Sequence, residues 1–171
     1  FQLRTINKQE WRTMQKSIDK IYYAAIYLRL SKEDGDLSSG EKKESNSIAN
    51  QRKLIEDYLS RNPEITLVQE FCDDGYTGAN FDRPDFQRMM EQVKTGKINC
   101  IIVKDLSRFG RDYIDSGRYI EKIFPSLGIR FIAINDNYDS AQSQQAGNEI
   151  ILPFKNLIND SYSRDISIKI R

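Results

Sequence analysis

Apolar residues along the chain occur in two patterns, as short continuous blocks and at helical spacing. The short blocks predict strands. Four blocks are rich in β-branched and aromatic residues, as buried strands are, and they cover residues 21–30, 65–72, 98–103 and 130–134. The block at 98–103 is almost continuously apolar, which is typical of a strand covered on both faces. The pattern therefore predicts four strands.

Apolar residues at helical spacing follow each of these strands. The spacing predicts helices over residues 45–60, 85–95, 113–127 and 147–171. Gly96 and Gly128 stand where a glycine commonly ends a helix, just past the second and the third of them. Pro153 must begin or kink the last helix, because proline cannot continue the helical hydrogen bonds.

The alternation of strands and helices predicts an α/β fold. We expect a mostly parallel sheet of about four to five strands with helices on both faces, followed by a long C-terminal helix. The polar segments at 32–44, 73–86 and 136–146 are expected to be loops. The apolar residues of the last helix exceed what one small domain needs, which favours a role in an oligomer interface.

The composition limits the possible kinds of active site mainly through the residue types and motifs that the sequence lacks. The 171 residues include no histidine, so a hydrolase triad built on histidine is excluded. Cys72 and Cys100 form no C-x-x-C pair, so no zinc site is expected, and both are predicted to be buried and reduced. The net charge is only +1, so a nucleic-acid site must come from local clustering. No apolar run approaches the ~20 residues that span a membrane and no signal peptide is visible, so we expect a cytoplasmic protein.

Candidate chemistry gathers at one edge of the predicted sheet, because ligands of such sheets bind beyond the carboxyl ends of the strands. Arg29 and Ser31 end the first strand two residues apart, so they are expected on the same side. The residues expected to converge there are Arg29, Ser31, Asp74, Thr77, Arg108 and Arg111, with Arg83 close by. Several guanidiniums around one hydroxyl suit a phosphodiester, because they bind its oxygens while the hydroxyl attacks.

Motifs in a fixed order strengthen this interpretation. They are YLRLS at 27–31, SIANQ at 47–51, DGYTG at 74–78 with RP at 83–84, and LSRFGR at 106–111. Over about residues 21–171 the chain resembles the catalytic domain of the serine recombinases, the resolvase/invertase family, and most of all the large serine recombinases of mobile elements. The resemblance implies a site-specific recombinase that acts on double-stranded DNA in integration or transposition.

The resemblance assigns roles to individual residues. Ser31 matches the family nucleophile, and Arg29, Arg108 and Arg111 match the arginines that bind and activate the scissile phosphate. Gln51 and Arg83 match further active-site residues. Supporting positions are Tyr27, Asp74, Thr77 and Ser107. The implied reaction is a transesterification without metal or cofactor, in which a 5′-phosphoserine intermediate preserves the bond energy.

The resemblance also implies an assembly and a division of the chain. Family members work as dimers that form a tetramer in the synaptic complex. Residues 1–20 are then an N-terminal extension and 21–146 the catalytic core. Residues 147–171 begin the long interface helix that leads to a DNA-binding region absent from this sequence.

Two positions depart from the family pattern. Small resolvases have an aspartate before the first arginine of the second cluster, where this chain has Ser107. If that carboxylate helps proton transfer, its role must pass to water, to the substrate or to Asp105. Ser163 replaces the acidic residue often found before an arginine early in the long helix.

Two other functions remain open at this point. Asp73 and Asp74 are an acidic pair after a strand, as in a magnesium-dependent, receiver-like regulator. A non-catalytic domain that oligomerises through the long helix is the other alternative.

Overall fold

The computed structural model describes residues 21–30, 46–76, 78 and 80–142. The predictions for 1–20, for Ser31 and the loop after it, for Thr77 and for 143–171 lie outside the described residues. The helix predicted from residue 147 is among these.

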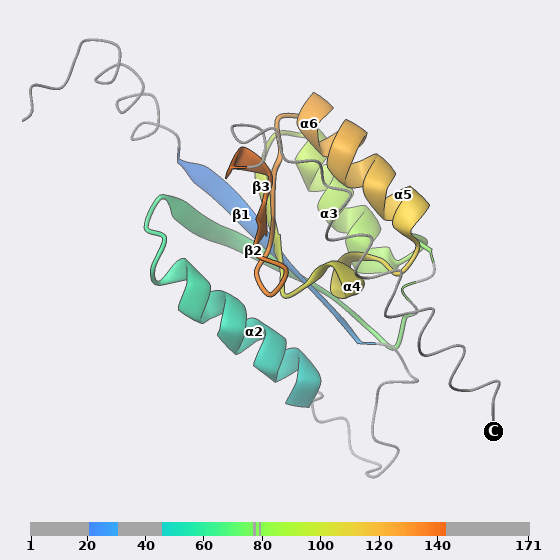
Figure 1. Ribbon diagram of the computed structural model, residues 1–171, viewed down its shortest axis with the longest axis horizontal. Coiled ribbons are helices and arrows are strands. Elements are labelled where there is room, and N and C mark those ends of the chain that lie inside the picture. The colour runs from blue at the N-terminus through green and yellow to red at the C-terminus, as the bar shows by residue number, and fades with distance from the viewer. Residues whose placement is uncertain (1–20, 31–45, 77, 79, 143–171) are drawn as a thin grey trace, which may run out of the picture.

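Five strands form one sheet in the described residues, in the order β2-β1-β3-β4-β5 (Figure 1). Their bounds are Tyr22–Leu30 (β1), Ile65–Asp74 (β2), Cys100–Val103 (β3), Arg130–Ala133 (β4) and Tyr138–Asp139 (β5). The pairs β1 and β2, β1 and β3, and β3 and β4 are parallel, whereas β5 is antiparallel to β4. The sheet is therefore mixed, and the four predicted strands are confirmed with their ends shifted by one or two residues.

The loop predicted at 136–146 is wrong in part, because β5 lies within it. Asn137 has a φ of 51°, which turns the chain back against β4. Asp139 is buried and accepts two hydrogen bonds from Arg130 of β4, from Nε at 3.0 Å and from Nη2 at 2.7 Å. Because β5 has only two residues and is held by an ion pair, it shows no alternation of apolar residues from which a strand could be predicted.

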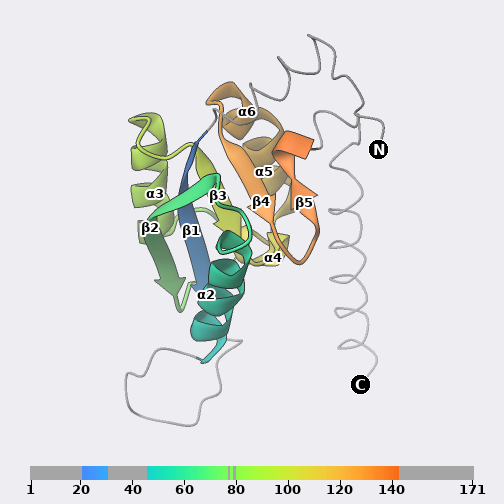
Figure 2. The ribbon, with the colours of Figure 1, turned by 90° about the vertical axis from the view of Figure 1, so that its left-hand side faces the viewer.

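Helices cover both faces of the sheet, as predicted (Figures 1 and 2). The helix α2, Asn46–Leu59, lies on one face. The other face carries α3 (Pro84–Lys94), α4 (Leu106–Phe109), α5 (Tyr113–Arg118) and α6 (Phe124–Ser126). The prediction missed α4, because a single helical turn is too short to show a period.

The sheet divides the core into two layers, since successive residues of a strand face opposite sides. Ala24 and Ile26 of β1 belong to the same apolar cluster as Ile55 of α2. Ala25 and Tyr27 belong to the cluster on the other side, to which α3 contributes its buried residues Phe86, Met89, Met90 and Val93. Cys100 is buried as predicted, whereas Cys72 is only partly buried.

The third predicted helix, over 113–127, is helical but not uniform. The residues Tyr119–Ile123 between α5 and α6 form a π-helical turn, in which the Phe124 N–H donates to Tyr119 O, five residues back. Pro125 follows at once, and its ring would clash with the carbonyl four residues before it in an α-helix. The wider turn relieves this clash, and the helical segment still ends just before Gly128, whose φ of 69° suits a glycine.

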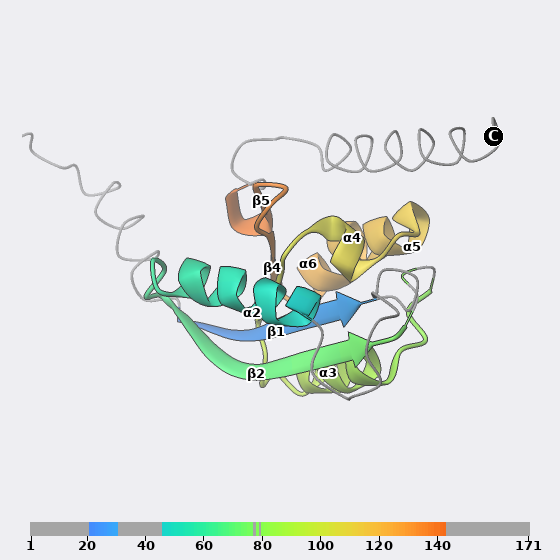
Figure 3. The ribbon, with the colours of Figure 1, turned by 90° about the horizontal axis from the view of Figure 1, so that it is seen from below.

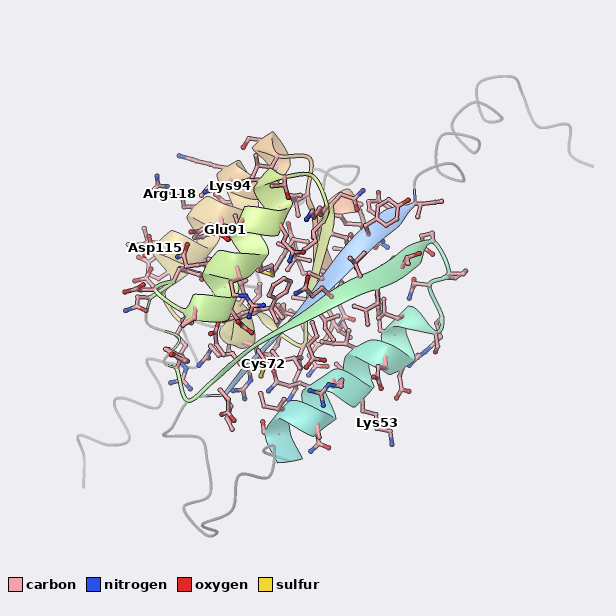
Figure 4. The ribbon with its side chains drawn as sticks, turned by 180° about the vertical axis from the view of Figure 1, so that it is seen from behind. Lys53, Cys72, Glu91, Lys94, Asp115 and Arg118 are labelled. Atoms are coloured by element: carbon pink, nitrogen blue, oxygen red, sulfur yellow. The ribbon has the colours of Figure 1, made fainter. Side chains whose placement is uncertain are left out.

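Charged side chains cover the outer surfaces of both helical layers (Figure 4). Lys53 is exposed on α2, while Glu91 and Lys94 of α3 and Asp115 and Arg118 of α5 are exposed on the other side. In the part of the chain that the structure describes, no helix has the length and apolarity needed to cross a membrane.

Candidate functional site

The carboxyl ends of β1 and β2 meet α4 and the start of α5 at one edge of the sheet (Figure 3). The two strands stay paired to their ends, where Arg29 lies opposite Asp73 and Leu30 opposite Asp74. The Gly75 N–H then donates to Leu30 O at 2.7 Å. The edge predicted to carry the chemistry is therefore built from neighbouring strand ends.

Arg29 is completely buried at this edge, and its guanidinium binds main-chain carbonyls. Nη2 donates to Ser107 O at 2.7 Å, and Nε donates to Arg108 O at 3.2 Å. Nη1 donates to Tyr76 O at 3.1 Å. A guanidinium has five N–H groups, so these three bonds leave two for a ligand.

The charges around Arg29 are mostly of its own sign. Burial and then the charges of Arg111, Arg83 and Arg108 lower the pKa of Arg29 to about 10. Arg108 is half-buried and Arg111 is exposed. The structure thus places the charges of Arg83, Arg108 and Arg111 near Arg29. So many like charges around a buried guanidinium favour a bound anion.

Arg83 is buried inside the protein and links three segments. Nη1 donates to the Tyr27 hydroxyl at 2.9 Å, and Nη2 donates to Phe109 O at 2.7 Å. The Tyr27 hydroxyl donates in turn to Asp73 Oδ2 at 2.8 Å. Asp73 also accepts the N–H groups of Asp85 and Phe86, so it caps the start of α3 from the end of β2.

Burial is the largest cause of the pKa shifts of both Arg83 and Tyr27. Burial lowers the pKa of Arg83 and raises the pKa of Tyr27 far above its ordinary value. The Arg83 guanidinium also lies over the rings of Tyr27, Phe81 and Phe86, with 4.7 Å to the Phe81 centroid. Arg83 thus has a structural role beneath the site, because Nη1 and Nη2 both donate to protein groups.

Gln51 lies on α2 and is also buried, and its amide binds the main chain of Arg29. Oε1 accepts the Arg29 N–H at 3.4 Å, and Nε2 donates to Arg29 O at 3.1 Å. On this side β1 pairs with β3 only at Ala24–Ile26, so the side chain of Gln51 takes the place of a strand neighbour. Gln51 therefore holds the segment that leads directly to Ser31.

Gly78 lets two of the arginines approach the same loop. Its carbonyl accepts the Arg111 N–H at 2.8 Å. A Cβ at this position would lie 2.8 Å from Arg29 Nη2 and 2.9 Å from Arg111 Cγ. Any larger residue would therefore displace the arginines, which makes Gly78 a site residue that the sequence alone did not single out.

Comparison with protein families identifies the chain. Residues 24–171 match the model of the resolvase N-terminal domain. The chain belongs to the resolvase family. It is a site-specific DNA recombinase domain of the serine recombinase type.

Solved structures establish the same fold for this resolvase domain. The N-terminal catalytic domain of TP901-1 integrase has a TM-score of 0.62 and 20% identity, over 84% of this chain and 98% of that one. A resolvase family site-specific recombinase from Streptococcus pneumoniae has a TM-score of 0.58 and 22% identity, over 87% of this chain and 93% of that one. The C-terminal catalytic domain of ISC1926 TnpA, an IS607-like serine recombinase, has a TM-score of 0.52 and 20% identity, over 66% of this chain and 69% of that one. No curated protein sequence matches the chain.

The structure brings most predicted residues of the resolvase site together. Arg29, Gln51, Arg83, Arg108, Arg111, Tyr27 and Ser107 all lie at or beneath the same edge. Asp74 is exposed at the end of β2. Ser31 and Thr77 lie outside the described residues, so their roles stay predictions.

The acidic pair Asp73 and Asp74 does not form a magnesium site in this resolvase domain. Neighbouring strand residues face opposite sides, and the oxygens of Asp73 are already bonded to Tyr27 and to the start of α3. Nowhere in the described ranges do three or more His, Cys, Asp or Glu side chains gather to hold a metal ion. The geometry therefore does not favour the receiver-like alternative, and the long helix of the assembly alternative lies outside the described residues.

Proposed function

We propose that this domain cuts and rejoins DNA through a covalent link to Ser31. Ser31 Oγ attacks the scissile phosphorus, the bond from phosphorus to the 3′ oxygen breaks, and a 5′-phosphoserine forms. The serine proton leaves Oγ, and a proton is delivered to the departing 3′ oxygen to give a free hydroxyl. Attack by a new 3′-hydroxyl reverses these steps, so joining needs no external energy source.

The gathering of four arginines at the end of β1 carries this proposal. Arg29 keeps two N–H groups beyond its three carbonyl bonds, and Arg108 and Arg111 lie near enough to lower its pKa. We assign these three guanidiniums to the nonbridging oxygens of the phosphate, where negative charge grows in the transition state. Such a field also favours the alkoxide form of a serine, since free serine is a weak nucleophile.

Gln51 and Arg83 act by positioning in this proposal. Gln51 fixes the backbone of Arg29, two residues before the nucleophile. Arg83 holds Phe109 O at the end of α4, which carries Arg108. We assign supporting roles to Asp74 and Thr77, and to Ser107, whose carbonyl accepts a hydrogen bond from Arg29 Nη2.

The wider assembly is also part of the proposal. The domain would act on double-stranded DNA as a homodimer that pairs into a tetramer, in the cytoplasm. Residues 21–146 would form the catalytic core, with 1–20 as an extension. Residues 147–171 would begin the helix that joins subunits and leads to the DNA-binding region.

The test is to trap the covalent intermediate on a nicked suicide substrate, with the natural gene product that contains this chain. Mass spectrometry of the digested adduct should find a phosphorylated nucleotide on Ser31, and Ser31→Ala should abolish the adduct. Ser60→Ala, at the far end of α2, should form the adduct at the wild-type rate. An adduct that survives Ser31→Ala, or that maps to another residue, would overturn the proposal.

A further inference from the structure

The helical turn α4 is very short, yet both of its ends are held by charged side chains. At its start, Asp105 Oδ1 accepts the Arg108 N–H at 3.1 Å and also the hydroxyl of Ser107. Asp136 Oδ2 accepts the Leu106 N–H at 2.6 Å. Two carboxylates therefore occupy N–H groups that an isolated helical turn leaves without a partner.

The other end of α4 is held by the opposite charge. The carbonyls of Ser107 and Arg108 accept hydrogen bonds from Arg29, and the carbonyl of Phe109 accepts one from Arg83. Negative groups at the first N–H groups and positive groups at the last carbonyls match the polarity of a helical turn. The orientation of Ser107 and Arg108 is thus set by side chains from outside α4.

Asp136 differs from the other three charged residues, because it comes from the turn between β4 and β5. That turn is fixed on the sheet by the Asn135 N–H, which donates to Lys104 O at 2.8 Å, and by the Asn137 N–H, which donates to Ile134 O at 3.1 Å. The carboxylate therefore reaches α4 from a turn that is hydrogen-bonded to Lys104, the residue that follows β3.

Asp136 keeps its contact at some electrostatic cost. The side chain is half-buried, and this burial raises its pKa, with a smaller contribution of the same sign from Asp105 and an opposing one from the Leu106 N–H. Asp136 therefore keeps its bond to the Leu106 N–H, at the start of α4, although its carboxylate is partly desolvated.

We propose that Asp136 is a positioning residue for DNA cleavage, which fixes the start of α4 so that Arg108 and Ser107 face the scissile phosphate. This inference rests on the proposed function, because it assigns Arg108 to that phosphate. Without the bond to Asp136, the Leu106 N–H loses its acceptor and α4 can rotate about its remaining contacts. DNA binding depends on many phosphate contacts and changes little, whereas the chemical step slows.

The experiment compares Asp136→Ala and Asp136→Asn in the natural gene product, with adduct formation on a suicide substrate as the readout. At saturating DNA, Asp136→Ala should slow adduct formation at least tenfold with DNA affinity within twofold of wild type. Asp136→Asn retains an oxygen that can accept the Leu106 N–H, so it should stay within about fivefold of wild type. A proton-transfer role would instead make Asp136→Asn as slow as Asp136→Ala, and that result would overturn the positioning role.

Asp139→Asn serves as the matched control, because it weakens the same β4–β5 hairpin at its ion pair with Arg130 and does not touch α4. It should lower the melting temperature yet keep the wild-type rate per folded molecule. An equal loss of rate in Asp139→Asn, or an unchanged rate in Asp136→Ala, would overturn the proposal. If wild type itself formed no adduct, the proposed function would fail instead. The two failures are distinguishable, because the wild-type reaction is measured first.

Discussion

At the scale of single residues, the site is organised around a conflict of charge at Arg29. This guanidinium is fully buried, yet the charges that act on it from Arg111, Arg83 and Arg108 are positive. Carbonyl oxygens from two neighbouring segments offset part of the repulsion. A bound phosphate would neutralise the remaining positive charge. The folded protein thus already holds the positive charge that stabilises the transition state.

Gln51 gives the first prediction at this scale. Gln51→Met has a similar volume but removes both hydrogen bonds to the main chain of Arg29, leaving two buried groups without partners. We expect a loss of about 1–3 kcal/mol in the free energy of unfolding and at least a tenfold slower formation of the DNA adduct. Chemical denaturation and suicide-substrate kinetics measure the two effects.

Lys53→Met is the matched control for Gln51→Met, since Lys53 is exposed on the same helix. It should change neither the stability nor the rate of adduct formation. A wild-type cleavage rate in folded Gln51→Met would show that the amide serves the fold alone, contrary to the proposed positioning role.

Cys100 gives a prediction about pH. Burial raises the pKa of its thiol to about 12, so ionisation is disfavoured in the folded state. An unfolded thiol ionises near pH 8.5, and the folded state therefore loses stability as the pH rises from there toward 12. Between pH 8 and pH 10.5 wild type should lose about 2–3 kcal/mol more than Cys100→Ala. Guanidinium unfolding at both pH values measures this difference, and equal losses in the two proteins would contradict it.

At the scale of elements, the sequence predicted what periodicity can reveal. The four longer strands and the helix α3 were predicted because apolar residues repeat over enough positions to show a period. The turn α4 and the strand β5 were missed because each is too short to show a period. The start of α4 is held by Asp136, 30 residues from Leu106, and β5 is held by Arg130 of the neighbouring strand. The arginines of the site were predicted from motifs, whereas Gly78 and Asp136 matter through spatial neighbours that no local pattern encodes.

The close approach of the 74–78 loop to the arginines gives a prediction about two glycines. Gly78→Ala places a Cβ within 2.8 Å of Arg29 Nη2, so the loop or the guanidinium must shift. We expect adduct formation to fall at least tenfold in suicide-substrate assays. Gly117→Ala is the matched control, because its Cβ would meet nothing within 4 Å inside α5. It should keep the cleavage rate and stabilise the helix by roughly 0.5–1 kcal/mol. Equal rates for the two variants would show that the space at Gly78 is unimportant.

At the scale of the whole molecule, the two core layers serve one edge of the sheet. The layer with α2 supplies Gln51 to the backbone of Arg29, while the other layer supplies Arg83 and α4. Strands β1 and β3 separate these layers, so contributions from both reach the site only where the strands end. The polar network of Arg29, Gln51 and Arg83 can therefore be buried beside the apolar core, because both layers supply hydrogen-bond partners at the strand ends.

The positive charge that the fold gathers at one edge of the sheet also predicts how the reaction responds to metal removal. Divalent ions assist phosphoryl transfer by placing positive charge on the phosphate oxygens. Here the guanidiniums of Arg29, Arg108 and Arg111 already supply that charge, and a cation entering among them would be repelled. Adduct formation in EDTA at constant ionic strength should therefore stay within twofold of the rate with Mg²⁺, and added Mg²⁺ should not restore activity to Arg108→Met. A wild-type reaction that stops in EDTA and resumes with Mg²⁺ would mean that the arginines alone do not carry the charge of the transition state.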